Sequence, residues 1–171
     1  ILLFAAFAAS RQGMAKVKET GTVAGYASLV VLAVLGLFLI GTSNMNVVQA
    51  DMIYKRAKPF DQQAGTEGDP QLWDVAIAIY NKAIDMTPAE DFYYLFLGRA
   101  YLERSALVED KGEQEALLQE AQDRLQEAQA INPLNTDHTA NLARLYRSWS
   151  DLVPNDPELR QTLLDKSLEQ Y

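Results

Sequence analysis

The chain has 171 residues, no cysteine and a formal charge of −8. Without cysteine, these residues form no disulfide, no catalytic thiolate and no cysteine-ligated metal site. The charge is uneven: residues 1–60 carry six Lys or Arg and two Asp or Glu, whereas residues 61–171 carry nine and twenty-one. Because the acidic part would repel phosphate groups, we expect no nucleic-acid partner.

The first residues, ILLFAAFAAS, are apolar but only about half as long as a membrane span. The basic segment that follows contains Arg11, Lys16 and Lys18. We therefore expect residues 1–21 to be the end of an earlier apolar helix and a basic loop.

The next element is a long apolar segment, because no charged residue occurs between Thr20 and Ala50. Its part 22–41, TVAGYASLVVLAVLGLFLIG, reaches the roughly twenty apolar residues that cross a bilayer as a helix, so we expect a transmembrane helix. A buried core helix and an uncleaved signal sequence are the alternatives. The positive-inside rule places the basic loop in the cytoplasm, which makes residues after Thr42 extracytoplasmic in a membrane-anchored or extracellular protein.

The acidic part contains an internal repeat of 45 residues. LGRAY at 97–101 is matched by LARLY at 142–146. AIAIYNKAIDMTP at 76–88 is matched by AQDRLQEAQAINP at 121–133. The matched positions of this second pair are Ala76, Tyr80, Ala83 and Pro88, and Ala121, Leu125, Ala128 and Pro133. Two patterns in one register predict a repeated unit of two helices.

These residues resemble the tetratricopeptide repeat, in which two helices cross at small residues and a proline ends the unit. Residues Tyr94, Leu97, Gly98 and Tyr101 match its first helix, and Leu142, Ala143 and Tyr146 are their counterparts one unit later. The resemblance implies an all-α fold, a tetratricopeptide-like helical-pair solenoid preceded by the long apolar, transmembrane-type helix. It also implies that Gly98 and Ala143 let the partner helix pack closely.

We expect three units, at 42–90, 91–134 and 135–171, of which the first matches weakly and the last is truncated. In the first unit, Val47, Ala50 and Tyr54 would occupy the first helix, and residues 58–70 would form its loop. The usual period is about 34 residues, so we expect both helices of the second unit to be lengthened around a turn near Asp110 to Gly112. The insertion around Pro154 should lie at the same edge.

No catalytic, cofactor-binding or metal-binding motif stands out, so we expect a non-enzymatic segment without a cofactor. The single histidine, His138, is expected to be exposed near a helix terminus.

The main functional hypothesis is a scaffold that binds a protein or an extended peptide in a groove of first-helix residues. The residues at helical spacing away from the packing positions are Tyr93, Phe96, Arg99, Asn141, Arg144 and Arg147. The alternative for each of them is a surface residue without a partner.

Two other hypotheses remain open. The chain could assemble head to tail into an extracellular filament or another homo-oligomer held by its apolar helix. Alternatively, its architecture resembles the C-terminal part of O-antigen ligase-type membrane proteins, which handle lipid-linked glycans, but no motif carries that resemblance. A glycan partner therefore has no support from a motif, and the sequence contains no acceptor site for asparagine-linked glycans.

Overall fold

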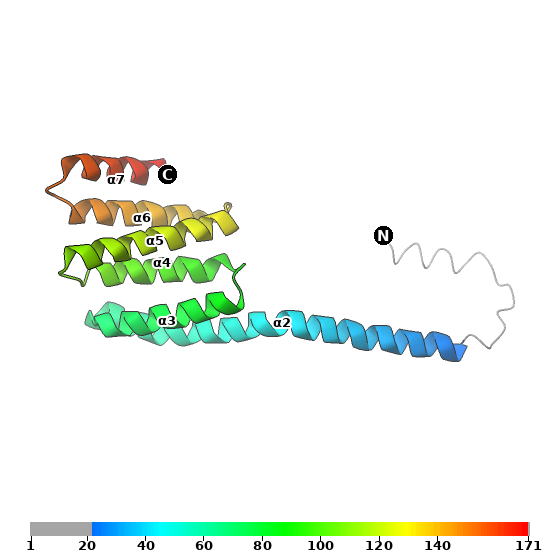
Figure 1. Cartoon of the computed structure of the whole chain (residues 1–171). Helices are drawn as coiled ribbons and strands as arrows, with labels where there is room; N and C mark the ends of the chain where they lie inside the picture. The colour runs from blue at the N-terminus through cyan, green and yellow to red at the C-terminus, as the bar shows by residue number, and fades with distance from the viewer. Residues whose placement is uncertain (1–21, 171) are drawn as a thin grey trace. The chain divides into compact units, whose positions relative to one another are not determined.

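The structure, a computed structural model, describes residues 22–170, and this part is all-α with no strand. Its helices are α2 Thr22–Glu67, α3 Pro70–Met86, α4 Asp91–Ser105, α5 Lys111–Ile131, α6 Thr136–Leu152 and α7 Pro157–Glu169 (Figure 1). A solenoid of helical pairs thus follows one long apolar helix. The expected helix end and basic loop at 1–21 lie outside the described residues.

The chain divides into two compact units, Ile1–Asn44 and Met45–Tyr171. The described part of the first unit is the apolar half of α2, and it contains the predicted segment 22–41. Within residues 22–170, this helix is the one long and apolar enough to cross a membrane, and none of its most apolar window is buried inside the chain. By length and composition it fits a membrane anchor or, near the N-terminus, a signal sequence.

The second half of α2 differs from the sequence prediction. Residues 58–70 do not form a loop, because α2 continues through Pro59 to Glu67 and only Gly68 and Asp69 separate it from α3. Gly68 adopts φ 66°, and its backbone N–H donates to the Ala64 carbonyl at 2.9 Å, which ends the helix. The helix tolerates Pro59 because neighbouring residues such as Ala57 and Ala64 are fully buried.

The contact between α2 and α3 lies close to this short turn. Tyr80 Oη donates to Asp61 Oδ2 at 2.9 Å, and a Cβ added to Gly65 would lie 4.0 Å from the Trp73 ring. Val47, which we expected in the first helix of the first unit, is 43% exposed. Ala50 and Tyr54, expected in the same helix, are buried in the core shared with α3. A two-residue connection turns α3 back along α2, so the segment that pairs with α3 also includes residues that we expected in a loop.

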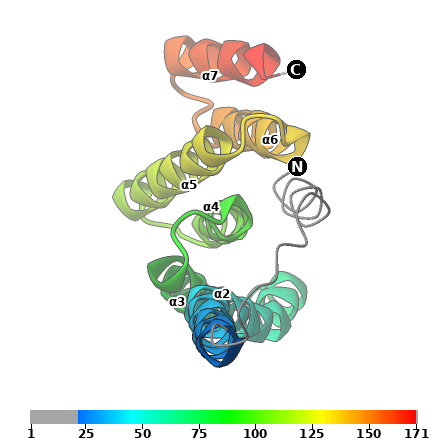
Figure 2. The same ribbon diagram turned by 90° about the vertical axis from the view of Figure 1, so that its right-hand side faces the viewer.

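Helix α4 is the centre of the compact unit Met45–Tyr171, because it contacts both α3 and α5. Helix α6 in turn contacts α5 and α7 (Figure 2). Tyr93, Leu97 and Ala100 of α4 belong to a core shared with α2 and α3. Tyr94, Leu95 and Leu102 belong to a second core shared with α5, α6 and α7. Two buried sides explain why α4 is apolar around most of its circumference.

Gly98 lies where α4 crosses α5. A Cβ at this position would lie 2.7 Å from Leu125 Cγ and 3.1 Å from the Ala121 carbonyl oxygen, so only glycine permits the observed approach. The other residues of the repeat pattern divide by burial. Tyr101 is partly buried, Pro88 and Pro133 are exposed, and the buried ones are Ala76, Tyr80, Ala83, Tyr94, Leu97, Ala121, Leu125, Ala128, Leu142, Ala143 and Tyr146.

The lengthening that we expected for the repeat at 91–134 falls mainly on one helix. Helix α5 has 21 residues, whereas α4 has 15, and the turn between them spans residues 106–110, slightly earlier than predicted. Gly112 lies in the first turn of α5, which Asp110 caps by accepting from Glu113 N at 2.8 Å. The α4–α5 and α6–α7 turns lie at the same end of the stacked helices (Figure 1).

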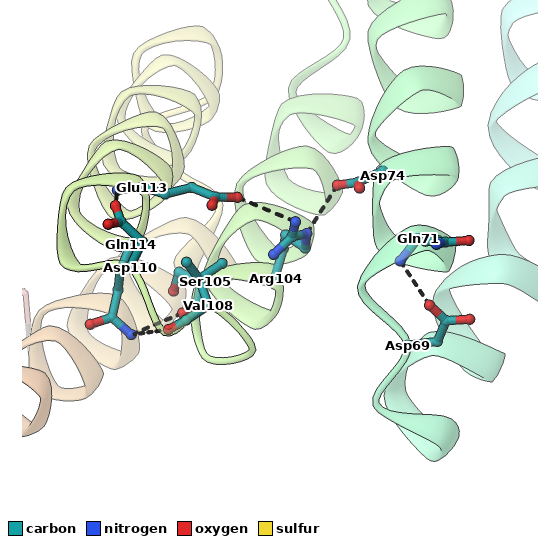
Figure 3. Close-up of polar contacts among 9 residues, drawn as sticks. All are labelled: Asp69, Gln71, Asp74, Arg104, Ser105, Val108, Asp110, Glu113 and Gln114. Carbon is teal, nitrogen blue, oxygen red and sulfur yellow. Dashed lines mark hydrogen bonds and ion pairs between the residues drawn. The ribbon is translucent and has the colours of Figure 1, made fainter.

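Polar contacts hold this end together (Figure 3). The Arg104 side chain, 14% exposed, pairs with Asp74 of α3 at 3.0 Å and Glu113 of α5 at 3.3 Å. The buried Gln114 amide donates to the carbonyls of Ser105 at 3.0 Å and Val108 at 3.4 Å. Arg104 therefore joins three consecutive helices, and Gln114 satisfies the carbonyls of the α4–α5 turn.

Candidate partner-binding face

Aromatic side chains of α2 and α4 form the most distinctive face of the second unit. Phe92 and Phe96 lie one turn apart on α4, with ring centroids 4.8 Å apart in an edge-to-face arrangement. The Tyr54 ring of α2 packs against them at 5.8 Å and 5.3 Å. Tyr54 is buried, whereas Phe92 is 39% exposed and Phe96 is partly exposed, so solvent reaches one side of the cluster.

Arg99 adds a cation to this face. Its guanidinium carbon lies 5.2 Å from the Phe96 ring centroid, in a cation–π arrangement. Arg99 takes part in none of the ion pairs found within residues 22–170. Its Nε is enclosed and has no hydrogen-bond partner. A guanidinium held on an aromatic ring without a carboxylate is suited to receive an acceptor group from outside.

Two tyrosine hydroxyls lie beneath the rings. Tyr80 donates to Asp61, whereas the buried Tyr54 Oη has no hydrogen-bond partner. Burial, followed by the negative charge of Asp61, raises the pKa of both tyrosines well above the ordinary value of 10.0. Both hydroxyls are thus protonated near neutral pH, and Tyr54 retains an unused donor.

Tyr93 does not line this face, although we predicted it there. It is 4% exposed, and its ring centroid lies 5.3 Å from that of Tyr54. The reason is that Ala50, Tyr54 and Ala57 of α2 share the core with the start of α4. Tyr93 is therefore a core residue, while Phe96 and Arg99 remain accessible.

The three predicted residues of α6 have different surroundings. Arg144 pairs with Glu103 of α4, and Asn141 Nδ2 donates to the Asp137 carbonyl at 2.7 Å. Arg147 is exposed, and no ion pair within residues 22–170 involves it. Arg144 and Arg147 are thus both exposed, but they differ in that Arg144 is paired with Glu103.

The two arginines of α6 line shallow hollows. One of about 210 Å³ is lined by Leu102, Glu103, Ser105, Ala106, Arg144, Ser148, Asp151 and Leu152. The other, of about 450 Å³, is lined by Arg147, Asp151, Arg160, Gln161, Leu164, Ser167 and Leu168. Arg144 and Arg147 thus line separate hollows, and neither hollow includes the Phe96 and Arg99 cluster.

The expectation that His138 is exposed was wrong. His138 is fully buried, and its Nε2 lies 2.6 Å from Asp91 Oδ2. Asn135 Nδ2 donates to the same oxygen at 3.2 Å, while His138 Nδ1 has no partner. The local sequence around His138 gave no sign of its burial, because its partner, the Asp91 carboxylate, lies 47 residues earlier in the chain.

Within the described part of the chain, no group of three His, Asp or Glu residues is arranged to hold a metal ion. The sequence prediction also missed Tyr54, Phe92 and Asp61 as members of the face. Phe92 had a signal, since it lies one helical turn before Phe96. Asp61 had none, because we placed it in a loop, and Tyr54, although expected in a helix, contacts Phe92 and Phe96 only through long-range packing.

No protein-family model matches the sequence, and no curated protein matches it.

Proposed function

We propose that this chain is a non-catalytic interaction module, a tetratricopeptide-like array that binds a protein or an extended peptide. The observation that carries the proposal is the face formed by Phe92, Phe96 and Arg99. It combines accessible aromatic surface with a cation that has no ion-pair partner among residues 22–170. Aromatic and arginine side chains are the residues most enriched in binding hot spots.

The spacing of the helices supports the repeat. Helix α6 begins 45 residues after α4, and α5 ends 45 residues after α3. Ser105 and Ser150, again 45 residues apart, are both buried, and each hydroxyl donates at 2.7 Å to the carbonyl three residues earlier. This agreement between element bounds and side-chain contacts is typical of stacked helical pairs, which bind partners along an extended face.

The chemistry of the face indicates the kind of segment it would bind. Phe92 and Phe96 favour an apolar or aromatic side chain. Arg99 favours a carboxylate or a backbone carbonyl. An extended segment with an apolar side chain next to an acidic group meets these requirements.

We further propose that residues 22–41 anchor the array in a membrane and that the array faces the extracytoplasmic side. The anchor rests on the length and apolarity of α2. The side rests on the basic residues Arg11, Lys16 and Lys18, which the positive-inside rule assigns to the cytoplasm.

Peptide selection tests the binding proposal. The full chain in a non-ionic detergent is used to enrich a displayed peptide library, and the enriched peptides are measured against the wild type, Arg99→Glu, Phe96→Ala and Lys82→Glu. Lys82→Glu is the control, since it makes the same charge change at an exposed site on α3. We expect Arg99→Glu and Phe96→Ala to weaken binding at least about tenfold and Lys82→Glu to change it less than about twofold.

Arg144→Glu and Arg147→Glu extend the test to α6. If the bound segment continues along the first helices, Arg147→Glu also weakens binding. An enriched pool that binds all five variants as well as it binds the wild type would contradict the proposal, provided that circular dichroism shows each variant to be folded.

A further inference from the structure

Helix α2 has two different faces within the compact unit Met45–Tyr171. Ala50, Tyr54 and Ala57 are buried in the core shared with α3 and α4. On the opposite side, Met45, Val48 and Met52 are 53%, 53% and 52% exposed. The same stretch of helix thus contributes to the core and also presents an apolar stripe to its surroundings.

The stripe has the spacing of a helix-pairing seam. Met45, Val48 and Met52 follow one another at intervals of three and four residues, which are the a and d positions of a heptad. Counting back by sevens from Met45 and Val48 gives Phe38 and Gly41 and then Val31 and Val34, all of which are exposed. Gln49 and Asp51 flank the stripe at e and g positions, so the apolar surface is narrow here.

Lipid does not account for this part of the stripe. Residues 22–41 are about 30 Å long as a helix, which matches the hydrocarbon thickness of a bilayer. Met52 lies eleven residues beyond Gly41 in the sequence, outside that segment. An apolar stripe that continues past the end of a membrane span at heptad spacing is suited to another helix with the same spacing.

We propose that α2 forms a parallel pair with α2 of a second copy of this chain, through a seam containing Met45, Val48 and Met52. The charged residues beside the seam are compatible with pairing between two copies. In the heptad register set by Met45 and Met52, Asp51 is a g position and Arg56 is the e position five residues later. A parallel pair brings Asp51 of each copy close to Arg56 of the other copy. Within one chain, Asp51 forms an exposed ion pair with Lys55, at 2.6 Å.

The pairing is independent of the binding face proposed above, since the two use different residues. It also defines a closed, two-fold interface, in which the same stripe serves both copies. Lys55, at the next d position, ends the apolar stripe, so the expected seam stops near Met52.

Disulfide trapping tests the pairing, because the chain has no cysteine of its own. Single variants Val48→Cys and Met52→Cys lie on the stripe, whereas Val47→Cys is a matched control at another exposed valine. The full-length variants are oxidised in native membranes. A disulfide requires Cα atoms within about 7 Å, so we expect cross-linked dimer from positions 48 and 52 to exceed that from position 47 at least about fivefold. Equal yields at the three positions would overturn the proposal.

A second variant separates pairing from folding. Met52→Glu places a charge on the stripe at a site exposed in the single chain, so helix content and melting temperature should be unchanged. The dimer dissociation constant, measured by light scattering in detergent, should rise at least about tenfold. A wild type that is monomeric, or a Met52→Glu variant that pairs like the wild type, would overturn the proposal. Protection of both cysteines from a water-soluble maleimide in a monomeric chain would assign the stripe to lipid instead.

Discussion

His138 Nε2 lies 2.6 Å from Asp91 Oδ2, so a buried imidazole in the first turn of α6 meets the first residue of α4. Asn135, which caps α6, donates to the same carboxylate oxygen. Because α4 and α6 belong to successive helical pairs, this junction fixes the placement of one pair on the next.

The Asp91 junction makes stability sensitive to acid. Burial alone would raise the pKa of Asp91, but hydrogen bonds from His138, Asn135 and Asn132 outweigh burial and lower it below the ordinary value of 3.8. A carboxyl with a lowered pKa stabilises the fold above its unfolded pKa and loses this contribution as the pH falls. The free energy of unfolding should therefore decrease as the pH falls below about 4.

Asp91→Ala tests this junction directly. It leaves His138 and Asn135 without their acceptor and should lower the free energy of unfolding by about 1–3 kcal/mol near neutral pH. Urea titrations followed by circular dichroism should show the difference from the wild type constant from about pH 6 to about pH 5 and shrinking as the pH falls below about 4. A difference that stays constant below about pH 4 as well would mean that the charge of Asp91 does not stabilise the junction.

Gly98 should resist substitution. Gly98→Leu forces a side chain against Leu125 and the α5 backbone and should destabilise the chain by about 3 kcal/mol, with Gly98→Ala less severe. Gly65→Ala is the matched control, because its new Cβ has no heavy atom closer than 4.0 Å among those around it. This control should be stabilised by up to about 1 kcal/mol from helix propensity. Equal effects at the two glycines would show that the α4–α5 crossing is looser than described.

The helix caps predict a contrast between two acidic residues. Asp156 accepts from Leu159 N at 2.9 Å at the start of α7, whereas Glu90, at the start of α4, makes no side-chain capping bond. Asp156→Ala should lower the free energy of unfolding by about 1 kcal/mol, and Glu90→Ala should change it by a few tenths at most. Chemical denaturation of both variants measures this, and a larger loss at Glu90 would contradict the capping assignment.

Tyr80 gives an expectation at high pH. Burial and Asp61 raise its pKa, so the protonated hydroxyl stabilises the fold below the ordinary pKa of 10.0, and this contribution is lost as the pH rises above it. Tyrosinate absorbance should show Tyr80 and Tyr54 ionising only when the helices unfold. Tyr80→Phe should be less sensitive to alkali and about 1 kcal/mol less stable near neutral pH. Complete tyrosine ionisation in a fully helical chain would refute the burial argument.

The all-α architecture was predictable because periodic apolar residues, helix caps and the 45-residue spacing are all local or repeated signals. Asp156 and Pro157, for instance, mark the start of α7 in the sequence as they do in the structure. The continuation of α2 through Pro59 was not predictable, since Pro, Gly and polar residues around it are typical of a loop. Packing of Ala57 and Ala64 in the core outweighs that local preference.

The candidate face was only partly predictable for a related reason. Helical spacing identified Phe96 and Arg99, which depend on α4 alone. The burial of Tyr93 depends on Tyr54, and that of His138 depends on Asp91. Both partners lie on other helices, far away in the sequence, so no local pattern reveals these contacts. Long-range contacts thus decide which first-helix residues remain accessible.

The most direct test of the proposed function is photo-cross-linking from position 96. A photoreactive phenylalanine analogue replaces Phe96 in the full chain in native membranes, and Ala116, exposed on α5, receives the same analogue as a control. The proposal predicts a discrete adduct from position 96 that Arg99→Glu abolishes, and no such adduct from position 116. Adducts of the same mass and yield from both positions, unaffected by Arg99→Glu, would contradict partner binding at this face.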